Sequence, residues 1–162
     1  MTTKLRDRSA GRDAGLRQST PARPVVLGTL SVRFDPSAER MAFDSALEAG
    51  VSLILANVMR MPPYPTTMRL VGPSAATLPH EEDLDAVRAT AQRAASLGIR
   101  TEHLRITSKR PVRALLEVTH ERQAGLLVFG PHLELIKPRQ FRAAAKAVRQ
   151  GATCLVWVAP DG

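Results

Sequence analysis

Residues able to recognise an anion gather in the segment 130–142. Gly130 and His132 follow an apolar run, and Lys137, Arg139 and Arg142 come shortly after them. Glycine lets backbone amides approach a phosphate closely, and arginine can hold a phosphate through two parallel hydrogen bonds. The segment therefore predicts a ligand-binding loop, and the alternative is a solvated, positively charged surface.

No catalytic or metal-binding set accompanies this loop. His132 could contact a ligand or act as a base, but no serine, cysteine or carboxylate nearby completes a catalytic set. The other histidines, His80, His103 and His120, lack metal-ligand spacing, and surface positions explain them. The single cysteine, Cys154, excludes an intramolecular disulfide and fits a reducing compartment. We expect no enzyme activity, no metal and a cytoplasmic location.

The positive charge of the chain is concentrated at its amino terminus. Residues 1–23 carry six basic and two acidic side chains, which is half of the net charge of +8. Because this segment has almost no periodic apolar content, we expect a disordered basic arm. It contains no aromatic residue for stacking on bases, so a solvated tail is expected and nucleic-acid binding is the alternative. No apolar run approaches the length of a membrane span, about 18 residues.

Apolar runs alternate with helical patterns over residues 24–160, which we expect to form one domain. The runs predict strands at 24–30, 51–59, 100–106, 125–129 and 154–158. Helices are predicted from Asp35 to Gly50, from Glu81 to Gly98 with Leu97 on its apolar face, from Pro111 onward, and up to Gly151. Strict alternation predicts an α/β fold, a single-domain, open, five-stranded parallel sheet with helices on both faces (doubly wound).

The segment 60–79 breaks this regular alternation. It contains five prolines and cannot be helical. A connection of this length is either a lid over a site or a disordered excursion, and both remain open. In an open parallel sheet, ligands bind beyond the carboxyl ends of the strands. Residues 130–144, which follow the fourth predicted strand, are therefore the expected place of a small-molecule site.

Three segments, taken in order, resemble the universal stress protein family. They are residues 25–28 leading to Ser37, residues 125–132, and residues 152–158 at the end of the chain. The resemblance covers about residues 24–160. It implies a domain of the adenine-nucleotide α-hydrolase-like type.

ATP-binding members of that family are similar to one another in two places, an aspartate ending the first strand and a Gly-x2-Gly-x9-Gly-Ser/Thr signature after the fourth. In this sequence the aspartate position is approximately Leu30, next to Thr29, and Gly130 supplies the first glycine. His132 stands where such members often carry a histidine. Leu133 occupies the second glycine position, and the last pair falls at 142–143 or 143–144, where alanines supply no hydroxyl.

The resemblance thus implies a ligand site with an incomplete phosphate cradle. Its expected residues are Thr29, Leu30, Gly130, His132, Arg139, Arg142 and Ala143. We expect no cofactor and no ordinary ATP binding. The alternative is a nucleotide-binding or slowly ATP-hydrolysing protein that uses Lys137, Arg139 and Arg142 in place of backbone amides.

The last predicted strand is expected at an edge of the sheet. An apolar edge strand left bare pairs readily with a second copy, and similar family members commonly dimerise through that edge. We therefore predict a homodimer formed through Cys154, Val156, Trp157 and Val158. The function implied is that of a stress-response binding or regulatory module with an unidentified protein partner.

Overall fold

Five parallel strands form one sheet in the computed structural model, which describes residues 22–30, 33–61 and 81–159, the side chains of 81–84 excepted. The strands are β1 (Val25–Thr29), β2 (Leu53–Arg60), β3 (Thr101–Ser108), β4 (Leu126–Phe129) and β5 (Leu155–Val158). Their order in the sheet is β3-β2-β1-β4-β5. The strand order reverses between β1 and β4, which makes this pair the topological switch point of the fold.

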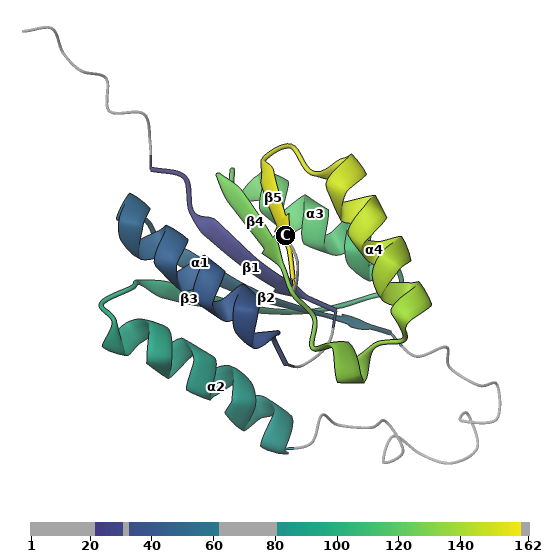
Figure 1. Cartoon of the computed structure of the whole chain (residues 1–162), viewed down its shortest axis with the longest axis horizontal. Helices are drawn as coiled ribbons and strands as arrows, with labels where there is room; N and C mark the ends of the chain where they lie inside the picture. The colour runs from purple at the N-terminus through teal and green to yellow at the C-terminus, as the bar shows by residue number, and fades with distance from the viewer. Residues whose placement is uncertain (1–21, 31–32, 62–80, 160–162) are drawn as a thin grey trace, which may run out of the picture.

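Helices cover both faces of the sheet (Figure 1). The pair α1 (Pro36–Ala49) and α2 (Glu81–Ser96) lies on one face, and α3 (Pro111–Glu121) and α4 (Pro138–Gly151) lie on the other. A short 3-10 helix, η3 (Leu133–Leu135), precedes α4. The predicted fold class is confirmed. The predicted arm at 1–23 and the predicted connection at 60–79 fall largely outside the described residues.

Burial explains why the central strands are continuously apolar. All five residues of β1 are buried, as are the first six of β2, because each strand contacts helices through both faces. Val25 and Leu27 belong to the core on the α1 side, whereas Val26 belongs to the core on the α3 and α4 side. The edge strand β3 alternates between half-buried and exposed residues.

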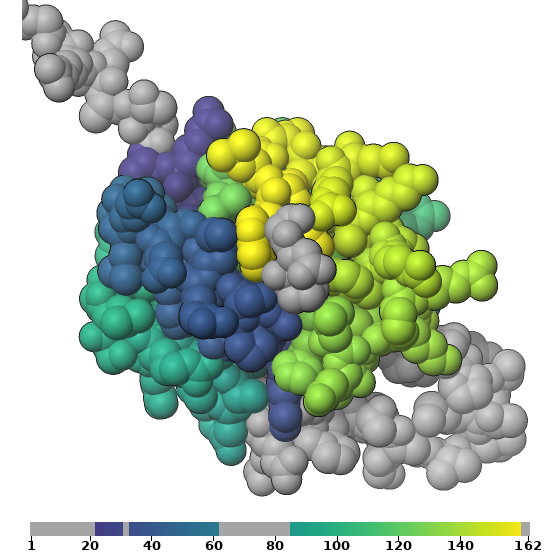
Figure 2. Space-filling model, in the orientation of Figure 1, coloured from purple at the N-terminus to yellow at the C-terminus, as the bar shows by residue number. Residues whose placement is uncertain are grey.

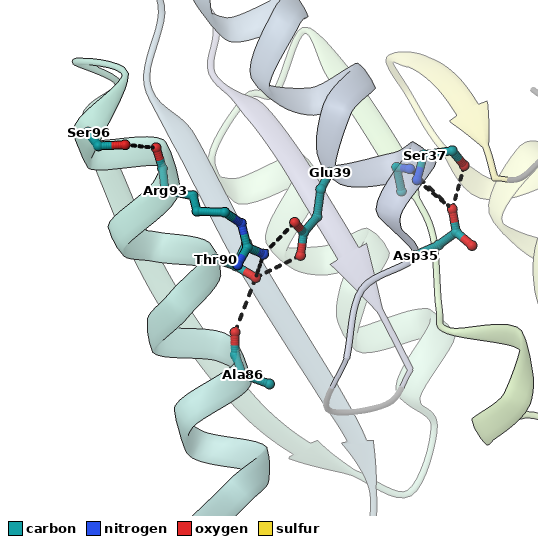
Figure 3. Close-up of polar contacts among 8 residues, drawn as sticks. Asp35, Ser37, Glu39, Ala86, Thr90, Arg93 and Ser96 are labelled. Atoms are coloured by element: carbon teal, nitrogen blue, oxygen red, sulfur yellow. Dashed lines mark hydrogen bonds and ion pairs between the residues drawn. The ribbon is translucent and has the colours of Figure 1, made fainter.

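The ends of α1 follow from its sequence as predicted. The carboxylate of Asp35 accepts hydrogen bonds from the amides of Ser37 (2.8 Å) and Ala38 (3.4 Å), which caps the helix (Figure 3). Gly50 closes it with a φ of 63°, a left-handed conformation suited to glycine. The expectation for Leu97 was wrong: its side chain is 51% exposed, because α2 ends at Ser96 and Ile99 enters the core instead.

A polar cluster joins α1 to α2 (Figure 3). The Oγ1 of Thr90 donates to Oε1 of Glu39 over 2.7 Å, and Nη2 of Arg93 donates to Oε2 of the same carboxylate over 2.6 Å. The side chain of Glu39 is 15% exposed, whereas that of Arg93 is 53% exposed. Most of the stabilisation should therefore come from the shielded Thr90 bond, since water screens the arginine.

Replacing Glu39 by alanine should lower the free energy of unfolding by about 1–2 kcal/mol, because Thr90 would lose its carboxylate partner. Asp85→Ala is the matched control. It breaks the Asp85–Arg88 pair, in which both side chains are more than 70% exposed, and should cost less than about 0.5 kcal/mol. Urea unfolding followed by circular dichroism measures both changes. Equal losses would show that the interhelical cluster does not stabilise the fold.

Candidate functional site

The loops that leave β1 and β4 are bonded to each other at the switch point. The amide of Asp35 donates to the carbonyl of Gly130 over 2.9 Å, and the amide of His132 donates to the carbonyl of Arg33 over 3.3 Å. Between these bonds, Phe34 and Pro131 form an antiparallel bridge. Backbone groups that a ligand would need at this point are therefore engaged by the protein itself.

Gly130 brings the end of β4 against the start of α1. A Cβ atom added at Gly130 would lie 2.1 Å from the Cβ of Ala38 and 3.2 Å from that of Ala159, which are impossible or strained separations. Phe34, 4% exposed, packs into the same region. The missing side chain of Gly130 thus serves the packing of α1. The first amides of that helix are also occupied, since Asp35 caps them.

The neighbouring predicted residues are only partly available to a ligand. Thr29 is fully buried, and its hydroxyl donates to the carbonyl of Arg33 over 3.2 Å. The half-buried ring of His132 has no hydrogen-bond partner for Nδ1 among the described residues. The nearest carboxylate oxygen, on Glu134, lies 3.9 Å away, beyond hydrogen-bond distance.

A hollow at this end of the sheet lies between α3 and α4, beyond the ends of β1 and β2. Its volume is about 660 Å³. Its lining comes from the strand ends, the beginning of α3, η3 and α4: Leu30, Arg60, Lys109, Arg110, Pro111, Val112, Arg113, Leu116, Leu135, Ile136, Gln140, Ala143, Ala144 and Ala147. This volume is within the range of pockets that bind small molecules.

The predicted site residues are thus divided between two places. Leu30 and Ala143 line the cavity, whereas Gly130 lies at the switch point with Thr29 and His132 close by. Arg139 and Arg142 are exposed on α4 and do not line the cavity. Lys137 is the N-cap residue of α4 and is also exposed.

Four cations that sequence reasoning missed line the cavity: Arg60, Lys109, Arg110 and Arg113. Nε of Arg113 is paired with Glu117 at 2.8 Å. No ion pair joins the other three to a carboxylate within the described chain, and the lining contains no acidic residue. A signal was present, since Arg60 ends β2 and Lys109 follows β3, and the carboxyl ends of parallel strands meet at one edge of the sheet.

The strand β5 lies at the edge of the sheet and has β4 as its neighbour in the described structure. Cys154 and Val156 pack partly against the core on the α4 side, and Val158 is buried there. Burial raises the pKa of the Cys154 thiol. Trp157 packs on the opposite face, and Leu155, which sequence reasoning missed, is 75% exposed. Figure 2 shows the strand reaching the surface beside α1.

Further titratable groups give no sign of a second centre. His103 Nε2 lies 3.0 Å from Oδ1 of Asn57, and burial followed by the charge of Arg105 lowers the pKa of this histidine. Within the described ranges, His, Cys, Asp and Glu side chains form no group of three or more able to hold a metal. Among the same residues, no helix combines the length and apolarity needed to cross a bilayer.

Comparisons with known proteins agree on one family. Its model, that of the universal stress protein family, matches residues 22–160. Comparison with curated proteins finds no match. The chain is similar to the structure of a universal stress protein in complex with cAMP, with 21% identity over 87% of this chain and 98% of that chain and a TM-score of 0.56.

Two further structures show the same likeness. A protein of the universal stress protein family from Burkholderia pseudomallei is 19% identical over 87% of this chain and 98% of that chain, with a TM-score of 0.63. The universal stress protein from Archaeoglobus fulgidus in complex with dAMP is 19% identical over 84% of this chain and 96% of that chain, with a TM-score of 0.52. At these identities the likeness concerns the fold.

Substituting Gly130 by alanine tests its packing role. The added Cβ must push α1 away from β4, so Gly130→Ala should lower the free energy of unfolding by about 2–3 kcal/mol. The double variant Gly130→Ala with Ala38→Gly removes the clashing atom and should recover all but about 1 kcal/mol, the cost of glycine in a helix. Urea unfolding measures both. A double variant no more stable than Gly130→Ala would contradict the contact.

Proposed function

The chain belongs to the universal stress protein family, and on that premise we propose that it is a dimeric binding and regulatory module of the stress response that lacks the ordinary ATP site. Its protein partner is unidentified. A cytoplasmic location is part of the proposal, supported by the single cysteine. One observation carries the proposal: Ala38 of α1 occupies the position of a side chain at Gly130, and the Gly130 carbonyl already accepts from the Asp35 amide.

The remaining positions of the nucleotide signature support the loss of ATP binding. Leu30 supplies no carboxylate at the end of β1 to accept hydrogen bonds from a nucleoside. Leu133 places a 40% exposed apolar side chain where a second glycine would admit a phosphate. Ala143 and Ala144 offer no hydroxyl near the start of α4. A nucleotide at this site would therefore lack most of the hydrogen bonds that hold its sugar and phosphates.

The cavity chemistry supports binding rather than catalysis. Among the described residues, its lining contains no serine, cysteine, histidine or carboxylate, so no base stands beside the one amine, Lys109, to activate it as a nucleophile. His132 lies outside the lining, and no hydroxyl or thiol contacts it in the described structure. A protein with this arrangement can hold a ligand but has no evident means to transform it.

A second candidate is a nucleotide-binding or slowly ATP-hydrolysing protein with a substituted site. The cAMP and dAMP complexes of similar proteins favour it. In this version, Lys137, Arg139 and Arg142 would bind phosphate with side chains instead of amides. Their exposed positions on and before α4 give them freedom to move, but no contact draws them together in the described structure.

Calorimetric titration with ATP and magnesium distinguishes the two candidates. We expect no saturable heat at low-micromolar ATP, because the phosphate cradle is incomplete. Saturable binding that Arg139→Gln with Arg142→Gln abolishes would establish the second candidate. Saturable ATP binding that this double variant leaves unchanged would contradict both the loss of the ATP site and phosphate binding by these arginines. It would indicate that backbone groups bind the nucleotide.

The edge strand β5 supports the proposed dimer. Leu155 and Ala159 donate their amides toward β4, to Gly125 and Phe129, so the alternate residues Val156 and Val158 direct their peptide groups to the open edge. An unpaired edge beside an apolar, exposed Leu155 is suited to pairing with a second copy. The side chains of Cys154, Val156 and Val158 face the α4 side, so their contribution would come from the backbone of the strand.

Leu155→Lys should weaken the dimer, because a lysine beside its symmetry-related copy opposes edge pairing. Leu97→Lys is the control, since Leu97 is also exposed but follows α2, far from β5 in the sheet order. Sedimentation velocity should show a wild-type dimer, a dissociation constant raised at least about tenfold by Leu155→Lys, and no change for Leu97→Lys. A monomeric wild-type protein would remove the dimer from the proposal.

A further inference from the structure

We propose that the cavity between α3 and α4 is a binding site for an amphipathic anion, a molecule with an aliphatic chain that ends in a carboxylate or phosphate. This ligand class deepens and rests on the proposed function, because Leu30 and Ala143, two positions of the nucleotide signature, line the cavity. The cavity involves neither Gly130 itself nor β5, so the inference stands whether or not the protein dimerises.

The walls of the cavity select an aliphatic body. They are formed mainly by aliphatic side chains from α3, η3, α4 and the residues that follow β1 and η3, including Leu30, Val112, Leu116, Ile136 and Ala144. Among the described residues, no aromatic or hydroxyl side chain lines the cavity, and Gln140 supplies the neutral polar group. The hydroxyls and base of a nucleoside would lose hydrogen bonds to water and find few hydrogen-bond partners in this cavity, which costs free energy. A methylene chain has no hydrogen bonds to lose, and it buries apolar surface when it enters the cavity.

Small residues on α4 create the space for this body. Ala143, Ala144 and Ala147 lie on the side of the helix that faces α3, and all three line the cavity. Phe141, one turn earlier, stacks on Phe129 with ring centroids 6.2 Å apart and so holds the start of the helix against β4. The helix is thereby fixed by its aromatic residue while its alanines leave the neighbouring volume open.

The cations at the mouth select a negative headgroup. Arg60 comes from the end of β2, and Lys109 and Arg110 come from the turn between β3 and α3. All three side chains belong to exposed residues, so they remain hydrated until a ligand recruits them. Because the lining has no carboxylate to compensate them, a bound anion would gain charge-assisted hydrogen bonds. Convergence of cations around an aliphatic pocket is the chemistry that recognises an amphipathic anion.

Calorimetry on the full chain with matched probes tests this assignment. Decanoate and decyl phosphate supply the chain with either headgroup, decanol supplies the chain alone, decyltrimethylammonium reverses the charge, and pyrophosphate supplies charge alone. We expect one saturable site per chain for at least one of the two anions, and the tighter one identifies the headgroup. Decanol and decyltrimethylammonium should bind at least about tenfold more weakly, because they forgo the charge-assisted bonds. Pyrophosphate should not compete.

Two pairs of variants locate the bound molecule. Lys109→Gln with Arg110→Gln should weaken anion binding about tenfold or more. Arg40→Gln with Arg100→Gln removes the same charge at exposed positions outside the cavity and should change it by less than about twofold. Ala143→Trp should abolish binding by filling the cavity, whereas Ala95→Trp, on an exposed position of α2, should not.

Several results would overturn the proposal. They are decanol binding as tightly as the anions, equal losses in the two double variants, and anion binding that survives Ala143→Trp. Absence of binding by both anions would also end it. Failure here leaves the proposed function intact, because that is decided by ATP titration and by the dimer.

Discussion

The close contact between Gly130 and the first turn of α1 is the constraint on which this end of the molecule depends. It places Ala38 where the side chain of any other residue would be, and it aligns the Asp35 amide with the Gly130 carbonyl. With Phe34 buried beside it, the switch point becomes part of the core. In most open α/β sheets the same place is a crevice for ligands. In this chain a hollow is found on the α3 and α4 side of the sheet, and its lining includes Leu30, which follows β1.

The residues that line this cavity differ in kind from those of a phosphate cradle. A phosphate cradle relies on backbone amides after β4, whereas the cavity draws its charge from side chains that follow β2 and β3. Amides are fixed by the fold, but long basic side chains adapt to the position of a headgroup at a cost in side-chain entropy. Recognition at this site should consequently favour a class of anions over a single compound. The fold shared with nucleotide-bound relatives therefore does not determine the ligand.

Local signals in the sequence were sufficient for the architecture. Alternation of apolar runs and helical patterns predicts the parallel sheet, and Asp35 and Gly50 mark the ends of α1. The cations of the cavity could have been inferred, because Arg60 ends β2, Lys109 follows β3 and these parallel strands end at one edge of the sheet. Their position beside Ala143 depends on the packing of α4, which local sequence signals do not show. The prediction that Leu97 lies on the apolar face of α2 was wrong for a local reason, because the apolar spacing continues past the residue where the helix ends. Gly130 follows β4 as predicted, but its sequence context cannot distinguish approach by a phosphate from approach by a helix.

This ambiguity has an evolutionary consequence. Selection for packing would retain a glycine at position 130 in a lineage that had ceased to bind nucleotides, because any side chain there would clash with Ala38. Leu133 experiences no such restraint, since its side chain is 40% exposed. In this chain the first glycine of the signature is thus required by the packing of α1, whereas the second position can accept a side chain. A comparison of family members that scores the signature as a whole would not separate glycines kept for packing from glycines kept for nucleotide binding.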